Sequence, residues 1–207
     1  MARNRRVYLV RHGDIGLSEG RKHFIGQINL PLSERGIRQA QLLSQELKDI
    51  SLSAIYCSTL IRSRETARII ADAHGLQPIV RDDLKEIHLG EWDGLAFDEV
   101  RERYPREFSE RGRDIIHYRP PGGESFLQCS QRVIAALAEI LGSTDGNLLI
   151  VGHSGPNRII LCHLLDIPLD KLFNIGQDLA GLSVILQRGS HYHLEQLNIT
   201  MRYPLVA

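Results

Sequence analysis

The 207-residue sequence predicts a three-layer α/β/α fold around a mostly parallel sheet with one antiparallel edge strand. Short runs rich in Val, Ile and Leu alternate along the chain with longer segments in which apolar residues recur every three to four positions. This alternation is typical of parallel strands whose connecting helices cover both faces of the sheet. The last apolar segment, "GLSVILQRGSHYHLEQLNI", turns at "RGS" and predicts a hairpin that supplies the antiparallel strand.

The other elements follow in chain order. Strands are predicted at 7–10, 52–59, 77–80 and 147–151. Helices are predicted after the N-cap residue Ser33, at 60–75 with an end at Gly75, before Pro105, at 125–141, and after residue 153 with Pro156 in the first turn. The charged stretch that ends at Arg119 predicts an excursion over the sheet. Residues 1–207 are expected to form one domain, with an ordered core at about 5–200.

The charge balance excludes some classes of protein. Lys and Arg together number 25, as do Asp and Glu, so no net field attracts nucleic acid or an anionic membrane. The basic cluster Arg3–Arg6 is expected to be a solvated tail. Neither a signal peptide nor a run of about 18 apolar residues occurs, which indicates a soluble, cytoplasmic protein.

The cysteines and histidines show no metal-binding spacing. Cys57, Cys129 and Cys162 lie far apart within apolar patterns, which predicts reduced thiols. No HExxH motif and no CxxC pair accompany the nine histidines. His191 and His193 alternate on one face of a strand and are expected to be exposed. The sequence therefore predicts no metal and no cofactor.

Four motifs carry polar side chains just beyond predicted strands or at turns, where ligands gather in parallel sheets. They contribute Arg11 and His12, Arg62, Glu86, and His153. His153 also directly precedes a helix N-terminus, which offers free N–H groups to an anion. Function is therefore expected at one edge of the sheet.

Arg62 is predicted to point inward. On a helix it shares a face with Thr66 and Ile69, whereas Arg64 and Arg68 lie together on the opposite side. A buried arginine is costly without an anionic partner, so either a structural carboxylate or a ligand is expected beside it.

Each motif also has a structural interpretation when it is taken alone. The alternatives are a surface turn at 11–13, a structural salt bridge at Arg62, an exposed acid at Glu86 of the kind expected for Glu91 and Asp93, and a hydrogen-bonded core histidine at His153. Together the five residues suit a phosphoryl group. Guanidinium forks match its oxygens, a neutral imidazole attacks phosphorus, and a carboxylic acid protonates the leaving oxygen.

The sequence resembles the histidine phosphatase superfamily, the phosphoglycerate-mutase-like proteins, over nearly the whole chain. The matching segments are "LVRHG" (9–13), "GQINLPLSERGIRQA" (26–40), "STLIRSRETA" (58–67), "LKEIHLGEWDG" (84–94), "PGGES" (121–125) and "VGHSG" (151–155). All six occur in this order at family-like separations. The resemblance implies the family's three-layer sheet with an antiparallel edge strand.

The resemblance also implies a role for each of the five polar residues. His12 would be the nucleophile that becomes phosphohistidine, while Arg11, Arg62 and His153 would surround the phosphoryl oxygens. Glu86 would be the acid and base. Attack requires a neutral His12, and two adjacent arginines lower its pKa in that direction.

The segment after "RHG" departs from the family pattern. Asp14, Ile15 and Ser18 stand where the family usually has Glu or Gln, then Thr or Ser, and an Asn a few positions later. Ile15 and Ile25 replace hydroxyl groups that could hold a sugar or a phosphoglycerate. Substrate contacts are predicted at Asp14, Ile15, Ser18, Ile25, Gly26 and Ser154.

Short connections around the site favour hydrolysis. The turn "LGEWDG" and the modest excursion from Tyr104 to Pro121 indicate an open pocket that admits water, which favours a phosphatase over a phosphoglycerate mutase. The segments "FIGQINLPLSERGIRQAQLL", "LGEWDG" and "PGGES" are most similar to the α-ribazole phosphatases of cobalamin synthesis, and broad-specificity sugar-phosphate phosphatases carry close relatives of them.

The expected partner is therefore a small phosphorylated metabolite, with no nucleic acid and no membrane, and a homodimer stays open. A cofactor-dependent phosphoglycerate mutase and a catalytically inactive phosphate-binding module remain alternatives.

Overall fold

Six strands form one mixed sheet in the computed structural model, which describes residues 4–17 and 20–201. They are β1 (Asn4–Arg11), β2 (Ala54–Ser58), β3 (Ile79–Arg81), β4 (Leu148–Gly152), β5 (Leu182–Arg188) and β6 (His191–Ile199). Their order in space is β3-β2-β4-β1-β5-β6. The first four strands along the chain are parallel, whereas β5 pairs antiparallel with β1 and with the edge strand β6. The mostly parallel sheet with antiparallel pairing at one edge is confirmed.

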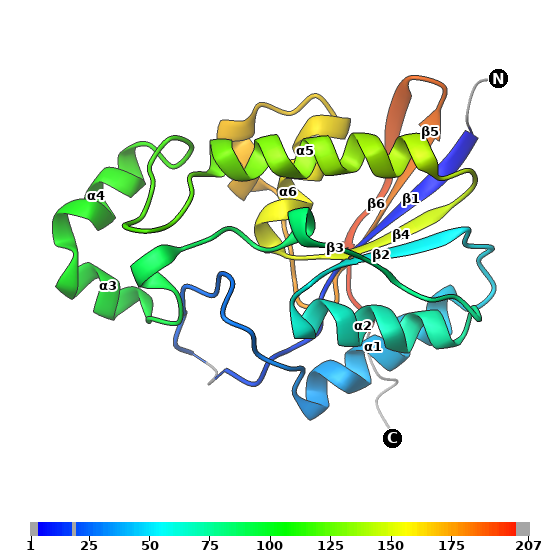
Figure 1. The fold of residues 1–207 in the computed structure, drawn as a ribbon, viewed down its shortest axis with the longest axis horizontal. Coiled ribbons are helices and arrows are strands. Elements are labelled where there is room, and N and C mark those ends of the chain that lie inside the picture. Colours follow the sequence, from blue (N-terminus) through cyan, green and yellow to red (C-terminus); the bar gives the residue numbers. More distant parts are fainter. Residues whose placement is uncertain (1–3, 18–19, 202–207) are drawn as a thin grey trace.

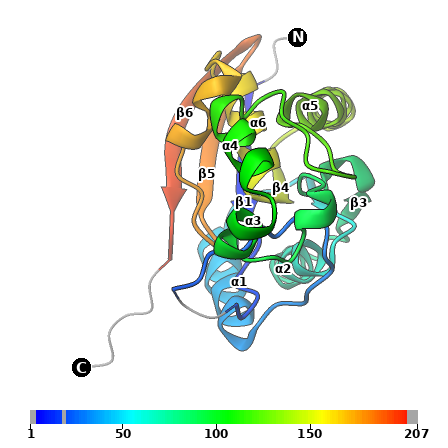
Figure 2. The ribbon, with the colours of Figure 1, turned by 90° about the vertical axis from the view of Figure 1, so that its left-hand side faces the viewer.

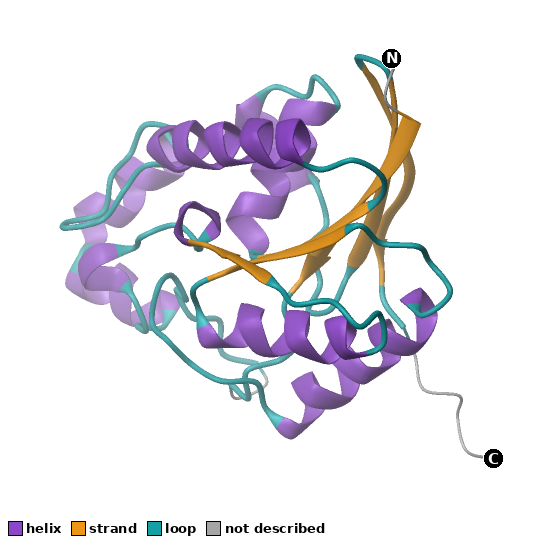
Figure 3. Cartoon of the chain, turned by 45° about the vertical axis from the view of Figure 1, so that its right-hand side comes forward, coloured by secondary structure: helices purple, strands orange, loops and turns teal. Residues whose placement is uncertain are grey.

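Helices cover both faces of this sheet. α1 (Glu34–Leu47) and α2 (Ile61–Asp72) pack on one face, and α5 (Phe126–Ser143) and α6 (Ser154–Leu164) pack on the other (Figures 1 and 3). Successive β1 residues point to opposite faces, so Tyr8 joins the core cluster beneath α1 and α2 while Leu9 joins the one beneath α5 and α6. The three-layer arrangement is confirmed.

The excursion beyond the sheet is helical. α3 (Phe97–Arg103) and α4 (Pro105–Arg113) lie past the carboxyl ends of the strands (Figures 1 and 2). The sequence predicted that Pro105 stops a helix, and α3 does end before it. The same proline then begins α4, because its fixed φ and missing N–H suit the first helical position. The helix predicted before Pro105 is confirmed as α3, and the excursion predicted after it is itself helical from Pro105 to Arg113.

Several local predictions are confirmed. The Ser33 hydroxyl accepts the Gly36 N–H at 3.1 Å as the N-cap of α1. Gly75 follows α2 with φ of +63°, which a glycine adopts at little cost. Cys57, Cys129 and Cys162 are buried and free, and His191 and His193 are exposed.

The expectation of a basic solvated tail is wrong for residues 4–6, and Arg3 lies outside the described residues. β1 begins at Asn4, and the side chain of Arg5 is buried. Its guanidinium donates to Gln187 Oε1 at 2.7 Å and to the carbonyl oxygens of Leu141 and Thr144 at the end of α5. A cation that satisfies the last carbonyls of a helix is stabilising. The groups that Arg5 contacts lie far away in the sequence, so no local pattern shows that the strand begins as early as Asn4.

Gly36 brings α1 against the loop after β1, and we expect Gly36→Ala to lower the free energy of unfolding by about 1–3 kcal/mol. A Cβ at this position would stand 2.1 Å from the carbonyl oxygen of Asp14. Urea unfolding measures the effect, with Gly142→Ala as the control, because a Cβ at this other helical glycine meets nothing within 4 Å. Equal stability of the two variants would contradict the close approach.

Candidate active site

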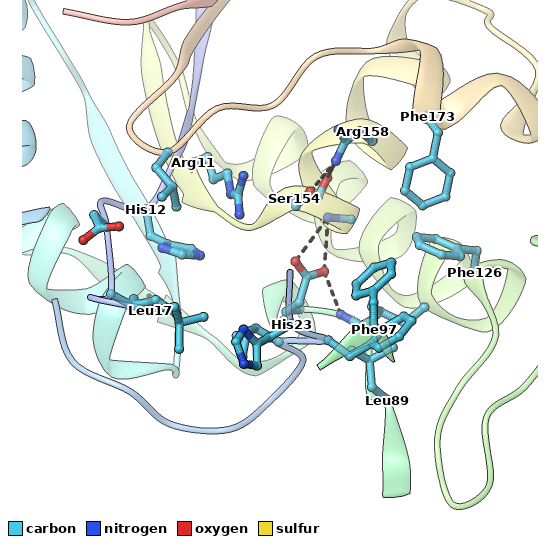
Figure 4. A pocket seen from close by; sticks show the side chains of 18 of the residues that line it. Arg11, His12, Leu17, His23, Leu89, Phe97, Phe126, Ser154, Arg158 and Phe173 are labelled. Carbon is cyan, nitrogen blue, oxygen red and sulfur yellow. Dashed lines mark hydrogen bonds between the residues drawn. The ribbon is translucent and has the colours of Figure 1, made fainter. Parts of the chain in front are cut away.

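A cavity of about 320 Å³ lies at the carboxyl ends of β1 and β4, where the sequence motifs meet (Figure 4). Seven of the predicted site residues line it: Arg11, His12, Asp14, Ile15, Ile25, Glu86 and Ser154. Arg62 and His153 have no exposed surface and lie behind His12, in contact with its ring. The tertiary structure therefore brings the five core residues of the sequence motifs to one place.

His12 is held as a neutral imidazole with a defined tautomer. Its Nδ1 lies 2.8 Å from the carbonyl oxygen of Gly13, and a carbonyl can only accept, so Nδ1 carries the proton. The lone pair is then on Nε2, which receives the Nε–H of Arg62 at 3.3 Å. Burial, followed by the charges of Arg11 and Arg62, lowers the pKa of His12 well below its ordinary value of 6.5. The ring is therefore uncharged at neutral pH.

Arg62 points inward from the first turn of α2, as predicted, but no carboxylate contacts it among residues 4–17 and 20–201. Its guanidinium instead donates to the carbonyl oxygens of Gly26 at 2.6 Å and Ile28 at 2.7 Å. Burial lowers its pKa, and Glu86 and Asp93 partly offset this through charge. Backbone carbonyls thus take the place of the structural carboxylate, and the other expected partner of Arg62, a ligand, stays a prediction.

Asp93 fixes the loop at 26–28, whose carbonyl groups accept hydrogen bonds from Arg62. Its carboxylate accepts the N–H groups of Gly26, Gln27 and Ile28 at 2.7 to 2.8 Å. The sequence predicted a merely exposed acid here, which is wrong for Asp93, since it is half-buried; Glu91 is exposed as expected. The loop and Asp93 are far apart in sequence, so no local pattern joins them.

His153 directly follows β4 and lies beside His12, with the centres of the two rings 5.1 Å apart. Its Nε2 is 2.7 Å from the hydroxyl of Ser58, which already accepts the N–H of Leu60. Within the described residues Nε2 is the one acceptor within reach of this hydroxyl, so donation to Nε2 satisfies both groups and places the proton of the neutral ring on Nδ1. This Nδ1 is buried without a hydrogen-bond partner in the described structure and is able to donate to an oxygen of a ligand.

Arg11 extends β1 into the cavity. One guanidinium nitrogen donates to the carbonyl oxygen of Gln177 at 2.5 Å, while Nε is buried without a partner among the described residues. Burial lowers its pKa and the charge of Glu86 opposes this. Arg11 thus retains hydrogen-bonding capacity for an anion.

Glu86 faces the cavity from the segment that follows β3, and its carboxylate meets the start of α6. Oε1 accepts the N–H of Ile87 at 2.9 Å and that of Gly155 at 3.1 Å. A Cβ on Gly155 would stand 2.6 Å from Oε1, so a glycine permits this approach. Burial raises the pKa of Glu86, although the two N–H groups and the charges of Arg62 and Arg11 oppose the rise. A raised pKa suits a group that gives and takes a proton near neutral pH.

Most of the residues predicted to contact the substrate line the cavity, and Gly26 lies behind its surface. Asp14 lines the cavity, yet its Oδ2 already accepts the Ser33 hydroxyl at 2.5 Å. Ile15 and Ile25 line the apolar part, and Ser154 lines the side near α6. Gly26 does not line the cavity, because its carbonyl lies behind the surface on Arg62. Ser18 lies outside the described residues.

Sequence reasoning missed the apolar wall of the cavity. Four phenylalanines from separate segments line it: Phe24, Phe97, Phe126 and Phe173. The last three are labelled in Figure 4. Phe24 and Phe97 stack with their ring centres 4.0 Å apart. These rings lie far apart along the chain, so no sequence periodicity connects them.

Two arginines were also missed, and each lies over one of these rings. Arg158 is over Phe173 at 5.4 Å and Arg111 is over Phe24 at 5.3 Å from the ring centre. Arg158 stands one helical turn after Ser154, a spacing that could have identified it. Arg111 stands in the charged excursion, where no pattern separates it from its neighbours.

The two buried histidines predict a pH-dependent stability. The unfolded chain binds their protons with a pKa near 6.5, whereas the folded protein lowers the pKa of His12 and His153 well below that value. The unfolded state therefore holds more protons as the pH falls through 6.5. We expect the free energy of unfolding to fall toward about pH 5, by up to about 1.4 kcal/mol per pH unit for each histidine. Glu86 has the opposite effect on the free energy of unfolding at pH values between 4.5 and its raised folded pKa, because there the folded state holds the extra proton.

Urea unfolding at about pH 7, 6 and 5 measures this dependence. We expect His12→Asn to flatten it, because one of the two buried imidazoles is removed. The exposed His193→Asn is the control and should keep the slope of the unchanged protein. An unaltered slope in His12→Asn would contradict burial of the neutral ring.

This α/β fold, with imidazole, guanidinium and carboxylate groups gathered at one edge of the sheet, defines a class of enzymes that handle phosphate groups. The sequence profile of the histidine phosphatase superfamily (branch 1) matches residues 7–200, and the chain belongs to this superfamily.

Similar proteins include phosphatases with different names. The chain is 36% identical over 197 residues to phosphoserine phosphatase 1 of Hydrogenobacter thermophilus, across 94% of this chain and 92% of that protein. It is 30% identical over 184 residues to the adenosylcobalamin/alpha-ribazole phosphatase of Escherichia coli, across 87% and 89% of the two chains. The structure of the alpha-ribazole phosphatase from Shigella flexneri matches with a TM-score of 0.86 and 29% identity, across 96% and 99%.

None of the helices in the described part of the chain is long and apolar enough to cross a membrane. Within residues 4–17 and 20–201, His, Cys, Asp and Glu side chains do not gather in groups of three or more that could hold a metal ion.

Proposed function

We propose that the protein hydrolyses phosphomonoesters through a phosphohistidine at His12. The observation that carries this proposal is the tautomer of His12, because its proton is on Nδ1 and its Nε2 lone pair lies at the guanidinium of Arg62. A neutral imidazole beside fixed cations is suited to attack a phosphoryl group whose negative charge the cations offset.

In the first step, the lone pair of His12 Nε2 forms a bond to phosphorus and the bond from phosphorus to the alcohol oxygen breaks. Glu86 in its acid form gives its proton to this oxygen, so a neutral alcohol leaves. Arg11, Arg62 and the Nδ1–H of His153 donate to the phosphoryl oxygens. Phosphoryl transfer needs mainly positioning and charge stabilisation, which these groups supply without moving far.

In the second step, Glu86 as a carboxylate removes a proton from water while the water oxygen attacks the phosphohistidine. The bond between phosphorus and Nε2 breaks, inorganic phosphate leaves, and Glu86 is again protonated. Both protonation states are needed in turn, which fits a carboxyl group whose pKa burial raises while Gly155 and the arginines oppose the rise.

Two alternatives are tested by turnover. A phosphoglycerate mutase primed with 2,3-bisphosphoglycerate would interconvert 2- and 3-phosphoglycerate faster than it releases inorganic phosphate. An inactive binding module would not hydrolyse p-nitrophenyl phosphate at all. We expect release of inorganic phosphate to be the faster reaction and p-nitrophenyl phosphate to be turned over, and the opposite result in either assay would overturn the proposal.

The identity of the leaving alcohol is proposed from the side chains that line the cavity. α-Ribazole 5′-phosphate, the substrate that the sequence resemblance favours, would bring an aromatic base to a wall that includes Phe97 and Phe126. Phosphoserine is the second candidate, because the cavity also holds the guanidinium of Arg111, which suits its carboxylate. A panel of these two esters, fructose bisphosphates and phosphoglycerates, compared by kcat/KM, ranks them.

A further inference from the structure

Arg111 brings a positive charge to the side of the cavity that faces the leaving alcohol. It lies on the last turn of α4 and lines the cavity together with Phe24 and Phe97. Its guanidinium carbon is 5.3 Å from the centre of the Phe24 ring. Phe24 in turn stacks on Phe97 of α3 and contacts Trp92, so this support is rigid. The position of the charge is therefore set by packing.

This guanidinium has no anionic partner within residues 4–17 and 20–201. It makes neither a hydrogen bond nor a salt bridge there, whereas Arg106 of the same helix pairs with Glu110 at 2.9 Å. Burial lowers the pKa of Arg111 to about 10, so the group remains charged at neutral pH. A half-buried cation with free donors is stabilised when an anion binds to it.

Each of the other three arginines at the site already donates to at least one acceptor, and Arg11 does so to the carbonyl oxygen of Gln177. Arg62 donates to two backbone carbonyls and contacts His12. Arg158 donates to the carbonyl oxygen of Ile175 at 2.8 Å and to Ser154. Among the four arginines at this site, Arg111 has the most unused donors, and it stands on α4 rather than on the strand ends that carry the phosphate-binding groups.

We infer that Arg111 binds a second anionic group on the substrate, so that the preferred substrates are phosphomonoesters whose alcohol carries a carboxylate or a further phosphate. Phosphoserine is therefore expected to be a better substrate than α-ribazole 5′-phosphate, whose alcohol carries no second anion. The inference rests on the proposed phosphatase function. Carboxylate and phosphate oxygens both match the planar guanidinium fork, which gives two parallel hydrogen bonds. The surrounding phenylalanines exclude water and strengthen this pairing.

Matched substrates test the inference directly. Phosphoserine and phosphoethanolamine differ only by a carboxylate. In the second pair, 3-phosphoglycerate has a carboxylate where glycerol 3-phosphate has a hydroxymethyl group. Fructose 1,6-bisphosphate and fructose 6-phosphate differ by a phosphate. We expect the protein to prefer the more anionic member of at least one type of pair by about tenfold or more in kcat/KM.

Arg111→Gln should remove this preference through a rise in KM of about 10- to 100-fold for the more anionic member. The loss of kcat/KM should be much larger for the more anionic member of each pair than for p-nitrophenyl phosphate, which has no second anion. Arg111→Lys keeps the charge but loses the fork, so it should retain part of the preference. Arg113→Gln is the control, because it removes the same charge from an exposed position at the end of α4.

The results distinguish the two anions and the two proposals. A preference confined to the carboxylate pairs assigns a carboxylate, and one confined to the fructose pair assigns a phosphate. Equal rates within every pair, or a preference that Arg111→Gln leaves intact, would overturn the inference while p-nitrophenyl phosphate is still hydrolysed. Absence of that hydrolysis would instead refute the phosphatase itself. If Arg111→Gln does not fold, as judged by thermal unfolding, the comparison of Arg111→Lys with the unchanged protein decides.

Discussion

His12→Ala is expected to lower kcat/KM for p-nitrophenyl phosphate by about 10⁴-fold or more, because it removes the atom that forms the covalent intermediate. The pocket around the ring is built by other residues, so the fold should persist. His12 contributes a buried ring whose Nδ1–H is used by Gly13 and whose Nε2 faces Arg62. Neither contact supports a helix or a strand of the sheet.

Trapping of the phosphohistidine tests the role of His12 more directly than a measurement of kcat/KM does. Incubation with a ³²P-labelled phosphomonoester followed by denaturation in base should leave label on the protein, and acid should remove it, as expected for a phosphohistidine. His12→Ala should retain no label, whereas the exposed His193→Ala should behave as the unchanged protein. Base-stable, acid-labile label on His12→Ala would assign the nucleophile to another residue.

Glu86→Gln is expected to separate substrates by their leaving groups. For alkyl phosphates, kcat/KM should fall by about 10²- to 10⁴-fold, because an alkoxide leaves poorly without a proton. For p-nitrophenyl phosphate the same parameter should fall much less, since its phenolate needs little protonation. The amide also cannot take a proton from water, so a burst of p-nitrophenol should precede slow turnover as the phosphohistidine accumulates.

Rapid-mixing measurements of p-nitrophenol release follow this burst. Glu91→Gln is the matched control, because it makes the same change at a nearby exposed acid and should leave both substrates unaffected. Equal losses with alkyl and aryl esters would contradict the role of Glu86 in protonating the leaving group, and absence of a burst would contradict its role in the second step.

Predictions that depended on periodicity agree with the structure. The spacing of apolar residues in α1 and the face of α2 that carries Arg62 and Thr66 both follow from the helical repeat, so short windows of sequence sufficed. His153 was expected at the end of a central strand, and β4 lies between β2 and β1. Residues at strand ends converge because parallel strands finish at one edge.

Predictions that treated charged residues by local context were less successful. Arg5 was assigned to a solvated tail, yet it is buried against the end of α5, and Asp93 was assigned to the surface, yet it holds the loop at 26–28. In both cases the partner is a backbone group far away in sequence. Backbone groups carry no sequence signature, so such contacts are invisible before folding.

The sequence by itself determined the layered fold, the superfamily and the set of five polar residues, because strand and helix periods and strand-end motifs are local properties. Only the tertiary structure decided the tautomer of His12, the carbonyl partners of Arg62, and the wall that joins Arg111 to Phe24. These depend on which distant segments pack together. The residues proposed to act on the phosphate could therefore be identified in the sequence. The side chains proposed to select the leaving alcohol include Phe97 and Arg111, which only the packing of α3 and α4 brings to the cavity.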